Sequence, residues 1–282
     1  MATSGALSPE DAAFETLETG EHHLREPLTM SLIRNFYGGL LLSAAGMSAL
    51  ILAMGVPEYT ADNPAVTRVL QGSVFPIGLV LVYALGAELF TGYPMWFCMT
   101  IADRKGKPWQ YVMTIIMSLG GNFLGALFWA VVQSYLTKTI TEEPFRSSII
   151  EQVDTNLTEQ QWIVVFLRSI GCGFLVSVAM VLGTQNRDGV SKALALWLPF
   201  FISTVAEFPH TVEYMYLGMV GMLIGAKLTV GMYLWKALLP IILGNAVGGA
   251  FVGGYNYFVF VRRGEEKQTG QRRDWLPESG DD

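Results

Sequence analysis

Charges, cysteines and histidines are all scarce in this sequence. Charged residues make up 15% of its 282 residues and hydrophobic residues 51%, whereas a soluble domain carries about 25% charge. The net charge of −6 provides no basic surface for nucleic acid. The two cysteines, Cys98 and Cys172, both lie in apolar runs, which excludes a disulfide framework and a cysteine metal cluster. These absences predict a membrane protein.

Six long runs with almost no charge predict six membrane-spanning segments. A helix crosses the hydrocarbon with about 20 apolar residues. The second and fifth runs are 34 residues each, which is too long for one straight crossing. The six runs cover residues 35–57, 69–102, 108–137, 160–186, 193–226 and 237–261.

The distribution of lysine and arginine predicts the orientation. With both termini inside, twelve of these residues fall on the cytoplasmic side and five on the outer side, which agrees with the positive-inside rule. The only glycosylation triplet, Asn156-Leu157-Thr158, then lies outside. We expect a multi-pass protein of the plasma or cell membrane, with N and C termini in the cytoplasm.

This orientation divides the chain into three parts. Residues 1–30 form an acidic cytoplasmic segment without the apolar stretch of a signal peptide, and His22 and His23 lie in this polar segment. Residues 31–263 form the six-helix domain. Residues 264–282 are rich in Glu, Lys, Gln and Gly and are expected to be a disordered cytoplasmic tail.

The two overlong runs carry matching motifs, which predicts an internal repeat. Ala87-Glu88 and Ala206-Glu207 each stand near a proline in the middle of their run. A Gly-Asn-x-x-Gly motif then follows each of them in the next span. Since each half has three spans, the second half must enter the membrane inverted. Helices interrupted at corresponding positions in inverted halves indicate a transport site at the midplane.

Polar side chains near these breaks have a structural interpretation. The glycines of Gly-Asn-x-x-Gly allow two helices to pack closely, while Asn122 and Asn245 could bind backbone groups freed at the neighbouring break. Glu88 and Glu207 could accept hydrogen bonds from freed N–H groups. We expect all four residues to support the helix breaks.

Three further polar residues lie within the apolar runs, where a charge costs about 2.5–3.5 kcal/mol. Arg168 is either an interfacial residue whose charged end reaches water or a cation that attracts anions. Glu213 is either a partner of His210 or a residue near the outer interface. The lone imidazole of His210 could exchange a proton with a passing anion, or it could be a hydrogen-bonded core residue.

With these motifs the sequence resembles the formate/nitrite transporter family. Gly86-Ala87-Glu88-Leu89-Phe90-Thr91-Gly92 is similar to the family motif of the interrupted second span, and Leu243-Gly244-Asn245-Ala246-Val247-Gly248-Gly249 to that of the sixth. His210 occupies the position of the family's central histidine. The resemblance implies an aquaporin-like all-α protomer of six transmembrane helices in a homopentamer, with one pore per protomer.

The resemblance also implies a cargo and roles for single residues. The cargo would be a small monovalent anion of a weak acid, such as formate, nitrite, hydrosulfide or a lactate-like monocarboxylate. We add the hypothesis that protons supplied through His210 accompany it, and we expect no cofactor. Thr91 would face His210 in the pathway, and Arg168 would lie in the vestibule. From its place in the fifth run we expect Glu207 in the same pathway. The apolar constriction would be formed by Phe75, Leu79, Phe90 and Val176. Departures from the family pattern fall at Gly173, Ser203, Pro209 and Tyr214.

We therefore expect a pH-linked anion channel or transporter rather than an enzyme. One alternative is an aquaporin-like channel for water or neutral solutes, although Asn63-Pro64-Ala65 occurs only once and before the second span. Another is an intramembrane metalloenzyme, because Glu207-x-x-His210-x-x-Glu213 has the spacing of one arm of a di-iron site. No second membrane histidine completes that site, so we expect no metal. A sensor or scaffold without transport is the third alternative.

Overall fold

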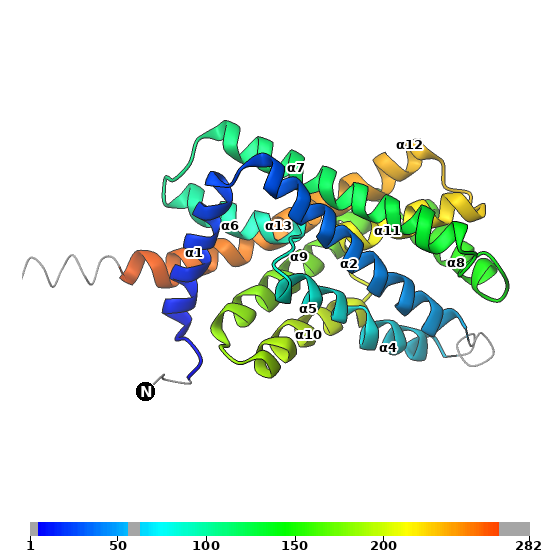
Figure 1. Cartoon of the computed structure of the whole chain (residues 1–282), viewed down its shortest axis with the longest axis horizontal. Coiled ribbons are helices and arrows are strands. Elements are labelled where there is room, and N and C mark those ends of the chain that lie inside the picture. The colour runs from blue at the N-terminus through cyan, green and yellow to red at the C-terminus, as the bar shows by residue number, and fades with distance from the viewer. Residues whose placement is uncertain (1–4, 56–62, 265–282) are drawn as a thin grey trace, which may run out of the picture.

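The computed structural model describes residues 5–55 and 63–264 (Figure 1), which contain helices and no β-strand. The predicted tail after Gly264 therefore lies outside the described residues. The α-helices are α1 (Pro9–Arg25), α2 (Leu28–Met54), α4 (Pro64–Val74), α5 (Pro76–Ala84), α6 (Tyr93–Ala102), α7 (Pro108–Phe128), α8 (Phe145–Val153), α9 (Trp162–Gln185), α10 (Gly189–Val205), α11 (Thr211–Ile224), α12 (Val230–Met232) and α13 (Leu239–Asn256). The short 3₁₀ or π-helical segments are η1 (Phe90–Gly92), η2 (Trp129–Leu136), η3 (Asp154–Glu159), η4 (Tyr233–Leu238) and η5 (Tyr257–Val261).

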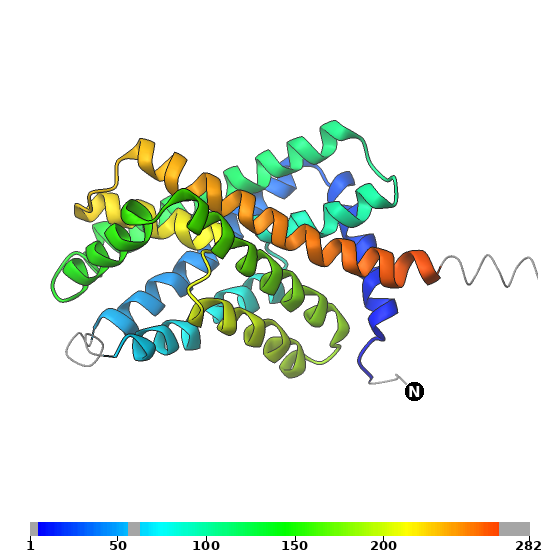
Figure 2. The ribbon, with the colours of Figure 1, turned by 180° about the vertical axis from the view of Figure 1, so that it is seen from behind.

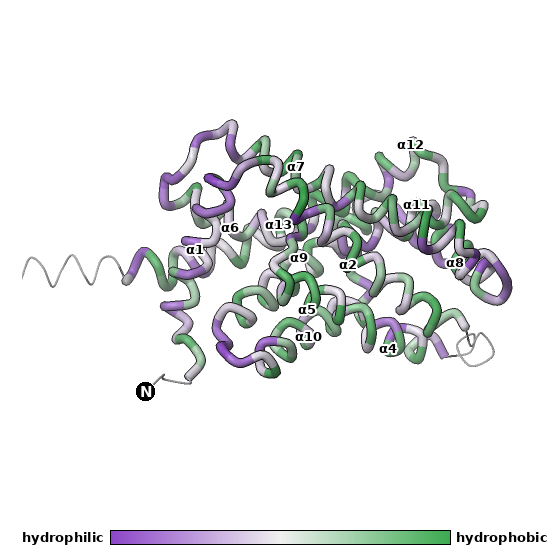
Figure 3. Tube along the Cα trace, viewed as in Figure 1, coloured by the Kyte–Doolittle hydropathy of each residue, from purple (hydrophilic) through white to green (hydrophobic). Residues whose placement is uncertain are grey.

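These helices form six segments that run between two ends of the molecule. We call the end that carries α1 the α1 face and the end that carries α8 the α8 face; they lie at the left and right of Figure 1 and are exchanged in Figure 2. Gly264 packs near Glu10 and Phe14 of α1, so the chain returns to the face from which its first span starts. The hydrophilic residues gather toward the two ends, and the helices between them are largely hydrophobic (Figure 3).

The segments have the composition of membrane spans. In the described part of the chain, five helices are long and apolar enough to cross a membrane: Leu28–Met54, Pro64–Ala84, Pro108–Leu136, Trp162–Gln185 and Val230–Gly264. Two shorter apolar helices, α10 and α11, together make the remaining segment. The predicted six-span all-α fold is confirmed.

The second and fifth segments are interrupted where the sequence predicts. The second has helix α5 up to Ala84 and helix α6 from Tyr93, and the fifth has α10 up to Val205 and α11 from Thr211. Two residues after each of α5 and α10 ends, the backbone has a left-handed residue: Gly86 at φ +66° and Glu207 at φ +53°. Glycine adopts this conformation freely, whereas any other residue is strained there.

The two breaks have the same pattern of backbone hydrogen bonds, but the equivalent residues are not those suggested by the two Ala-Glu pairs. In the first break, backbone bonds run from Gly86 N to Tyr83 O and from Ala87 N to Val82 O. In the second break, the same bonds run from Glu207 N to Thr204 O and from Phe208 N to Ser203 O. The equivalent residues are thus 121 apart, so Glu207 corresponds to Gly86 and Pro209 to Glu88. The expected pairing of Glu88 with Glu207 is wrong by two residues.

Glycines bring the first and third span of each half into close contact. A Cβ on Gly39 of α2 would lie 2.4 Å from the backbone oxygen of Asn122 on α7. In the second half, a Cβ on Gly173 of α9 would lie 2.1 Å from the backbone oxygen of Asn245 on α13. Because α2 starts at the α1 face and α9 at the α8 face, the two packed pairs have opposite directions. The predicted inverted repeat is confirmed.

The acidic N-terminal segment contains a structured helix that the sequence did not predict. Ser8 caps α1 by accepting a hydrogen bond from Asp11 N. The apolar side of α1 packs on α6 and on η5. His23, which was placed in a polar segment, is 3% exposed and lies 4.4 Å from the Trp96 ring, centroid to centroid.

Candidate functional site

The two breaks meet at a pair of fully buried polar side chains. Thr91 lies in η1 of the first break, and His210 caps the N-terminus of α11 after the second. Thr91 Oγ1 is 3.1 Å from His210 Nε2, and neither residue is exposed. The structure thus places Thr91 opposite His210, in the arrangement that the resemblance implies.

The backbone of α11 orients the imidazole ring. The N–H group of Glu213 points to His210 Nδ1 at 3.4 Å, as in an N-cap. When Nδ1 accepts this bond in the neutral ring, the ring proton is on Nε2 and points to Thr91. The backbone amide of Glu213, rather than its carboxylate, is therefore the partner of His210. The carboxylate lines a small cavity of about 20 Å³ beside Gln71 and Gln152.

Two aromatic rings enclose the histidine. Phe75, at the junction of α4 and α5, lies 6.4 Å from the His210 ring, and Phe200 of α10 lies 5.3 Å from it. The two phenyl rings are 5.0 Å apart and both are buried. Ser203 does not leave a gap, because Phe200 one turn earlier supplies an aromatic ring. The sequence reasoning missed Phe200, although its helical spacing from Ser203 could have indicated it.

The remaining predicted constriction residues are also buried, in different positions. Leu79 of α5 lines a cavity of about 520 Å³ that opens at the α1 face and reaches Thr91. Phe90 precedes Thr91 in η1, and Val176 lies on α9; neither lines this cavity. Leu89, which was not predicted, does line it. The cavity thus reaches Thr91, whose hydroxyl contacts His210 Nε2.

Two asparagines bind the freed backbone of the breaks in the same way. Asn122 Oδ1 accepts a bond from Phe90 N (2.8 Å), and its Nδ2 donates to Glu88 O (3.0 Å). Asn245 Oδ1 accepts from Thr211 N (2.9 Å), and its Nδ2 donates to Pro209 O (3.0 Å). Each amide thus satisfies one N–H and one C=O group that a continuous helix would have paired.

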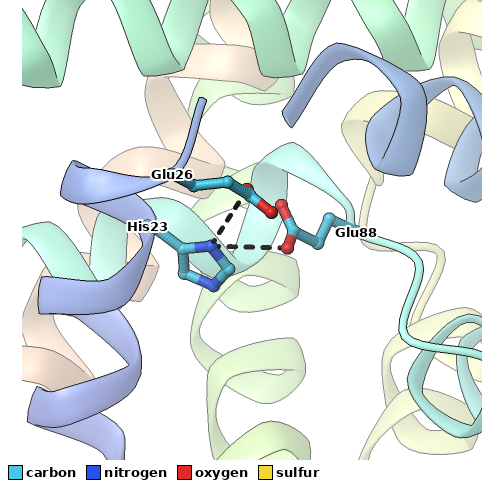
Figure 4. Close-up of side chains that lie close together, drawn as sticks. All are labelled: His23, Glu26 and Glu88. Atoms are coloured by element: carbon cyan, nitrogen blue, oxygen red, sulfur yellow. Dashed lines mark ion pairs between the residues drawn. The ribbon is translucent and has the colours of Figure 1, made fainter. Parts of the chain in front are cut away.

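Glu88 has different partners from those expected. Its carboxylate accepts bonds from Tyr93 and from Asn35, and Arg34 Nη1 lies 2.7 Å from Oε1. Within the described residues no backbone N–H donates to it, so the expected bonds to freed N–H groups are wrong for Glu88. The residue instead ties the first break to α2 and to α1, where His23 faces it (Figure 4).

Arg168 and Glu207 are brought together at a partly exposed site on the other side of His210. Glu207 Oε2 lies 2.8 Å from Arg68 Nη2 and 3.8 Å from Arg168 Nη2. Glu207 is therefore ion-paired and does not bind freed N–H groups in the described part of the chain. Two arginines against one carboxylate leave a net positive charge, which attracts anions. Arg68 was not singled out in the sequence.

The cavity at the α1 face has the opposite charge balance. It is lined by Glu15, Glu18 and Glu88 against one arginine, Arg34. Next to two of its lining residues, His23 and Arg34, the pKa of Glu26 is lowered from 4.5 to about 2 by these two neighbours, so this carboxylate is ionised at neutral pH. The local charges thus favour an anion at the Arg168 side more than at the α1 face.

The arrangement at His210 does not form a di-iron half-site. His210 uses Nε2 toward Thr91 and Nδ1 toward a backbone amide, while Glu207 pairs with arginines. Among residues 5–55 and 63–264, the donor atoms of Glu207, His210 and Glu213 do not gather into a metal-binding group. The pair of a hydroxyl and an imidazole in an apolar surrounding can instead donate hydrogen bonds and pass a proton.

Comparison with known proteins identifies the family. The sequence pattern of the formate/nitrite transporter family matches residues 10–259. The chain belongs to this family. Formate/nitrite transporters are membrane transport proteins rather than enzymes, so this protein is an integral, multi-pass anion transport protein.

Individual relatives of this formate/nitrite transporter are distant in sequence. A probable formate transporter of Methanothermobacter thermautotrophicus is 28% identical over 274 residues, which are 92% of this chain and 99% of the relative. An uncharacterized transporter of Saccharomyces cerevisiae is 27% identical over 98% of this chain, which spans 45% of the length of that relative. A solved pentameric formate channel with formate bound shares the fold with a TM-score of 0.71, at 22% identity over 83% of this chain and 98% of that chain.

Proposed function

We propose that each copy of this chain conducts small monovalent anions of weak acids, such as formate or nitrite, past Thr91 and His210. The observation that carries the proposal is the buried contact of 3.1 Å between Thr91 Oγ1 and His210 Nε2. It lies where both interrupted spans meet and beside the end of an open cavity. No other imidazole lies at this depth in the described spans.

The apolar surroundings explain why a proton donor is needed. An isolated anion cannot cross the region of Leu79, Phe75 and Phe200 cheaply, because burying an unpaired charge costs many kcal/mol. With Nδ1 bound by the Glu213 amide, Nε2–H of His210 can donate to Thr91, whose hydroxyl hydrogen is then free for the anion. For transfer, His210 first takes a second proton from water on Nδ1, in place of the Glu213 amide bond, and becomes an imidazolium. Its Nε2 proton then passes through the Thr91 hydroxyl to the anion, which gives the neutral acid and a neutral imidazole, and the neutral acid crosses the barrier more easily.

This route links flux to pH and to voltage in a defined way. Formate and nitrite, like a free aspartate with a pKa near 3.9, are almost fully ionised at neutral pH. If a proton accompanies each anion, the net movement is neutral and does not respond to the membrane potential. An anion that crosses alone gains or loses about 2.3 kcal/mol per 100 mV.

The charges around the pathway support a direction of approach. Arg68 and Arg168 exceed Glu207 by one charge at one end, and the cavity at the α1 face is acidic. We infer that anions approach from the Arg168 side. Positive-inside counting places the α1 face, and therefore both termini, in the cytoplasm.

A homopentamer is part of the proposal. Large apolar side chains are exposed along the spans, among them Ile116, Leu198 and Phe251, and they need lipid or a neighbouring copy as a partner. The solved formate channel that shares this fold is pentameric. Light scattering of the purified protein in detergent tests this expectation.

The substrate is tested by flux into proteoliposomes. Uptake of labelled formate, nitrite, hydrosulfide, lactate and acetate is compared at two external pH values, with protein-free vesicles as the control. We expect saturable uptake of one or more of these anions that increases at the lower external pH. Osmotic swelling without any anion uptake would contradict the proposal and favour a channel for water or neutral solutes.

A further inference from the structure

Three donor atoms of buried side chains converge where α1 meets the first break: His23 Nδ1, Glu26 Oε2 and Glu88 Oε1 (Figure 4). They all lie within 4.8 Å of one another. His23 Nδ1 is 3.3 Å from Glu88 Oε1 and 3.9 Å from Glu26 Oε2. None of the three atoms makes a hydrogen bond of acceptable geometry. Glu88 Oε1 is ion-paired with Arg34 Nη1 at 2.7 Å, so His23 Nδ1 and Glu26 Oε2 are the two atoms of the cluster left unsatisfied. Because buried polar atoms are almost always satisfied, these two converging atoms indicate a missing ligand.

The charges of the cluster indicate the sign of that ligand. Glu26 and Glu88 contribute two negative charges, and Arg34 contributes one positive charge through contacts of 2.9 Å and 2.7 Å. Arg34 binds Glu26 through Oε1 and so leaves Oε2 free. On Glu88, Arg34 pairs with Oε1, the oxygen that faces His23, and Tyr93 binds Oε2. A buried cluster with one uncompensated negative charge is unfavourable, and this negative charge attracts a cation to the three converging atoms.

We propose that His23, Glu26 and Glu88 bind a divalent transition-metal ion, for which Zn²⁺ is the best match. Donors at 2.0–2.1 Å from one tetrahedral ion are about 3.3 Å apart, and the observed separations from His23 Nδ1 are 3.3 and 3.9 Å. One imidazole and two carboxylates suit zinc, whereas Mg²⁺ and Ca²⁺ prefer oxygen ligands alone. His23 and Glu88 also line the cavity at the α1 face, so a water molecule can fill the fourth position.

The surroundings are arranged as expected around such a site. The ring of Trp96 at 4.4 Å and that of Tyr93 at 5.2 Å hold the His23 imidazole in place, and Arg34 fixes both carboxylates. Outer contacts of this kind orient metal ligands. A proton on His23 Nδ1 is the competing occupant, since Glu88 Oε1 lies 3.3 Å away, and the zinc measurements below distinguish it from a metal ion.

A bound ion would connect three segments that are far apart in sequence: the end of α1, the turn before α2, and the first break. The sequence analysis expected no metal, and it placed His23 in a polar segment outside the membrane domain. The proposal concerns binding and does not depend on the transport function, so either can fail without the other.

Zinc binding to the purified full-length protein tests the proposal. Protein carrying a tag without histidines is stripped with EDTA and dialysed against ZnCl₂, and bound zinc is measured by mass spectrometry. We expect about one zinc ion per chain in the wild type and a loss of this ion in His23→Ala. The matched control is His22→Ala, which removes the exposed neighbouring histidine and should keep the ion.

Thermal unfolding gives a second measurement that does not require every variant to be equally stable. Added ZnCl₂ should raise the Tm of the wild type and of His22→Ala, because an ion that binds only the folded state stabilises it. Zinc should not raise the Tm of His23→Ala or Glu26→Gln, and MgCl₂ should raise the Tm of none of the four proteins. Absence of bound zinc from the wild type overturns the proposal. Equal amounts of bound zinc in the wild type, His23→Ala and Glu26→Gln overturn it as well.

Discussion

Asn245→Ala is the perturbation whose cost follows most directly from the structure. The Asn245 amide accepts from Thr211 N and Oγ1 at 2.9 and 2.7 Å, and it donates to Ser169 O at 2.8 Å and Pro209 O at 3.0 Å. Alanine removes all four contacts. The N–H of Thr211 and the C=O of Pro209 then remain buried without a partner, because the break prevents a helical bond at both positions.

The expected magnitude comes from these two orphaned groups. Each buried group left unsatisfied costs about 1–3 kcal/mol, so we expect Asn245→Ala to destabilise the protein by about 2–6 kcal/mol. For a domain of this size, 1 kcal/mol corresponds to about 2–4 °C in Tm, so the variant should unfold at least about 4 °C below the wild type. Asn122→Ala should have a similar effect, because Asn122 makes equivalent bonds to Phe90 N and Glu88 O.

The assay is thermal unfolding of the purified protein in detergent, with Asn256→Ala as the matched control. Asn256 is buried on the same helix, but its side chain donates only to Val252 of that helix. We therefore expect a much smaller change for the control. Equal Tm values for Asn245→Ala and Asn256→Ala would refute the reasoning that the two asparagines hold the breaks.

Three further predictions concern packing, charge and the barrier. In Gly173→Ala the new Cβ would lie 2.1 Å from a backbone oxygen, so α9 and α13 must separate and the Tm should fall. The control Gly120→Ala adds a Cβ with nothing within 4 Å, so it should not lower the Tm by more than a degree or two. Equal Tm values for the two variants would contradict the close approach of α9 and α13. Glu207→Gln should change the free energy of unfolding by less than about 1 kcal/mol, since its ion pairs are partly exposed. It should lower the KM for formate, because Arg68 and Arg168 lose their counter-charge. An unchanged or higher KM in initial-rate measurements would argue against an anion vestibule at these arginines. Phe200→Ala removes the ring 5.3 Å from His210 and should raise the lactate-to-formate uptake ratio, and a constant ratio would place Phe200 outside the barrier.

The sequence predicted the architecture because charge and proline patterns report it directly. The length of the two overlong apolar runs and the prolines near their middle predicted both interruptions, which lie at residues 85–92 and 206–210. The Gly-Asn-x-x-Gly motifs predicted close packing of the helices that carry them. These features depend on residues near one another in the chain, so no knowledge of distant contacts was needed.

The contacts between distant residues could not be predicted in the same way. Glu88 and Glu207 are the same residue type at similar places, yet the turn geometry sets them two positions apart, and each has its own arginine partners. Likewise, nothing local to His23 shows that α1 folds back onto the first break. The partner of a buried polar residue depends on which helices meet, and that is decided by packing across the whole domain.

The central claim is that an anion passes the Thr91–His210 pair together with a proton. Its most direct test is labelled formate uptake into proteoliposomes at clamped membrane potential, for the wild type and His210→Phe at two external pH values. We expect wild-type uptake to increase at the lower external pH and to be independent of the potential, and His210→Phe to lose this pH dependence. Unchanged flux and pH dependence in His210→Phe would contradict the claim.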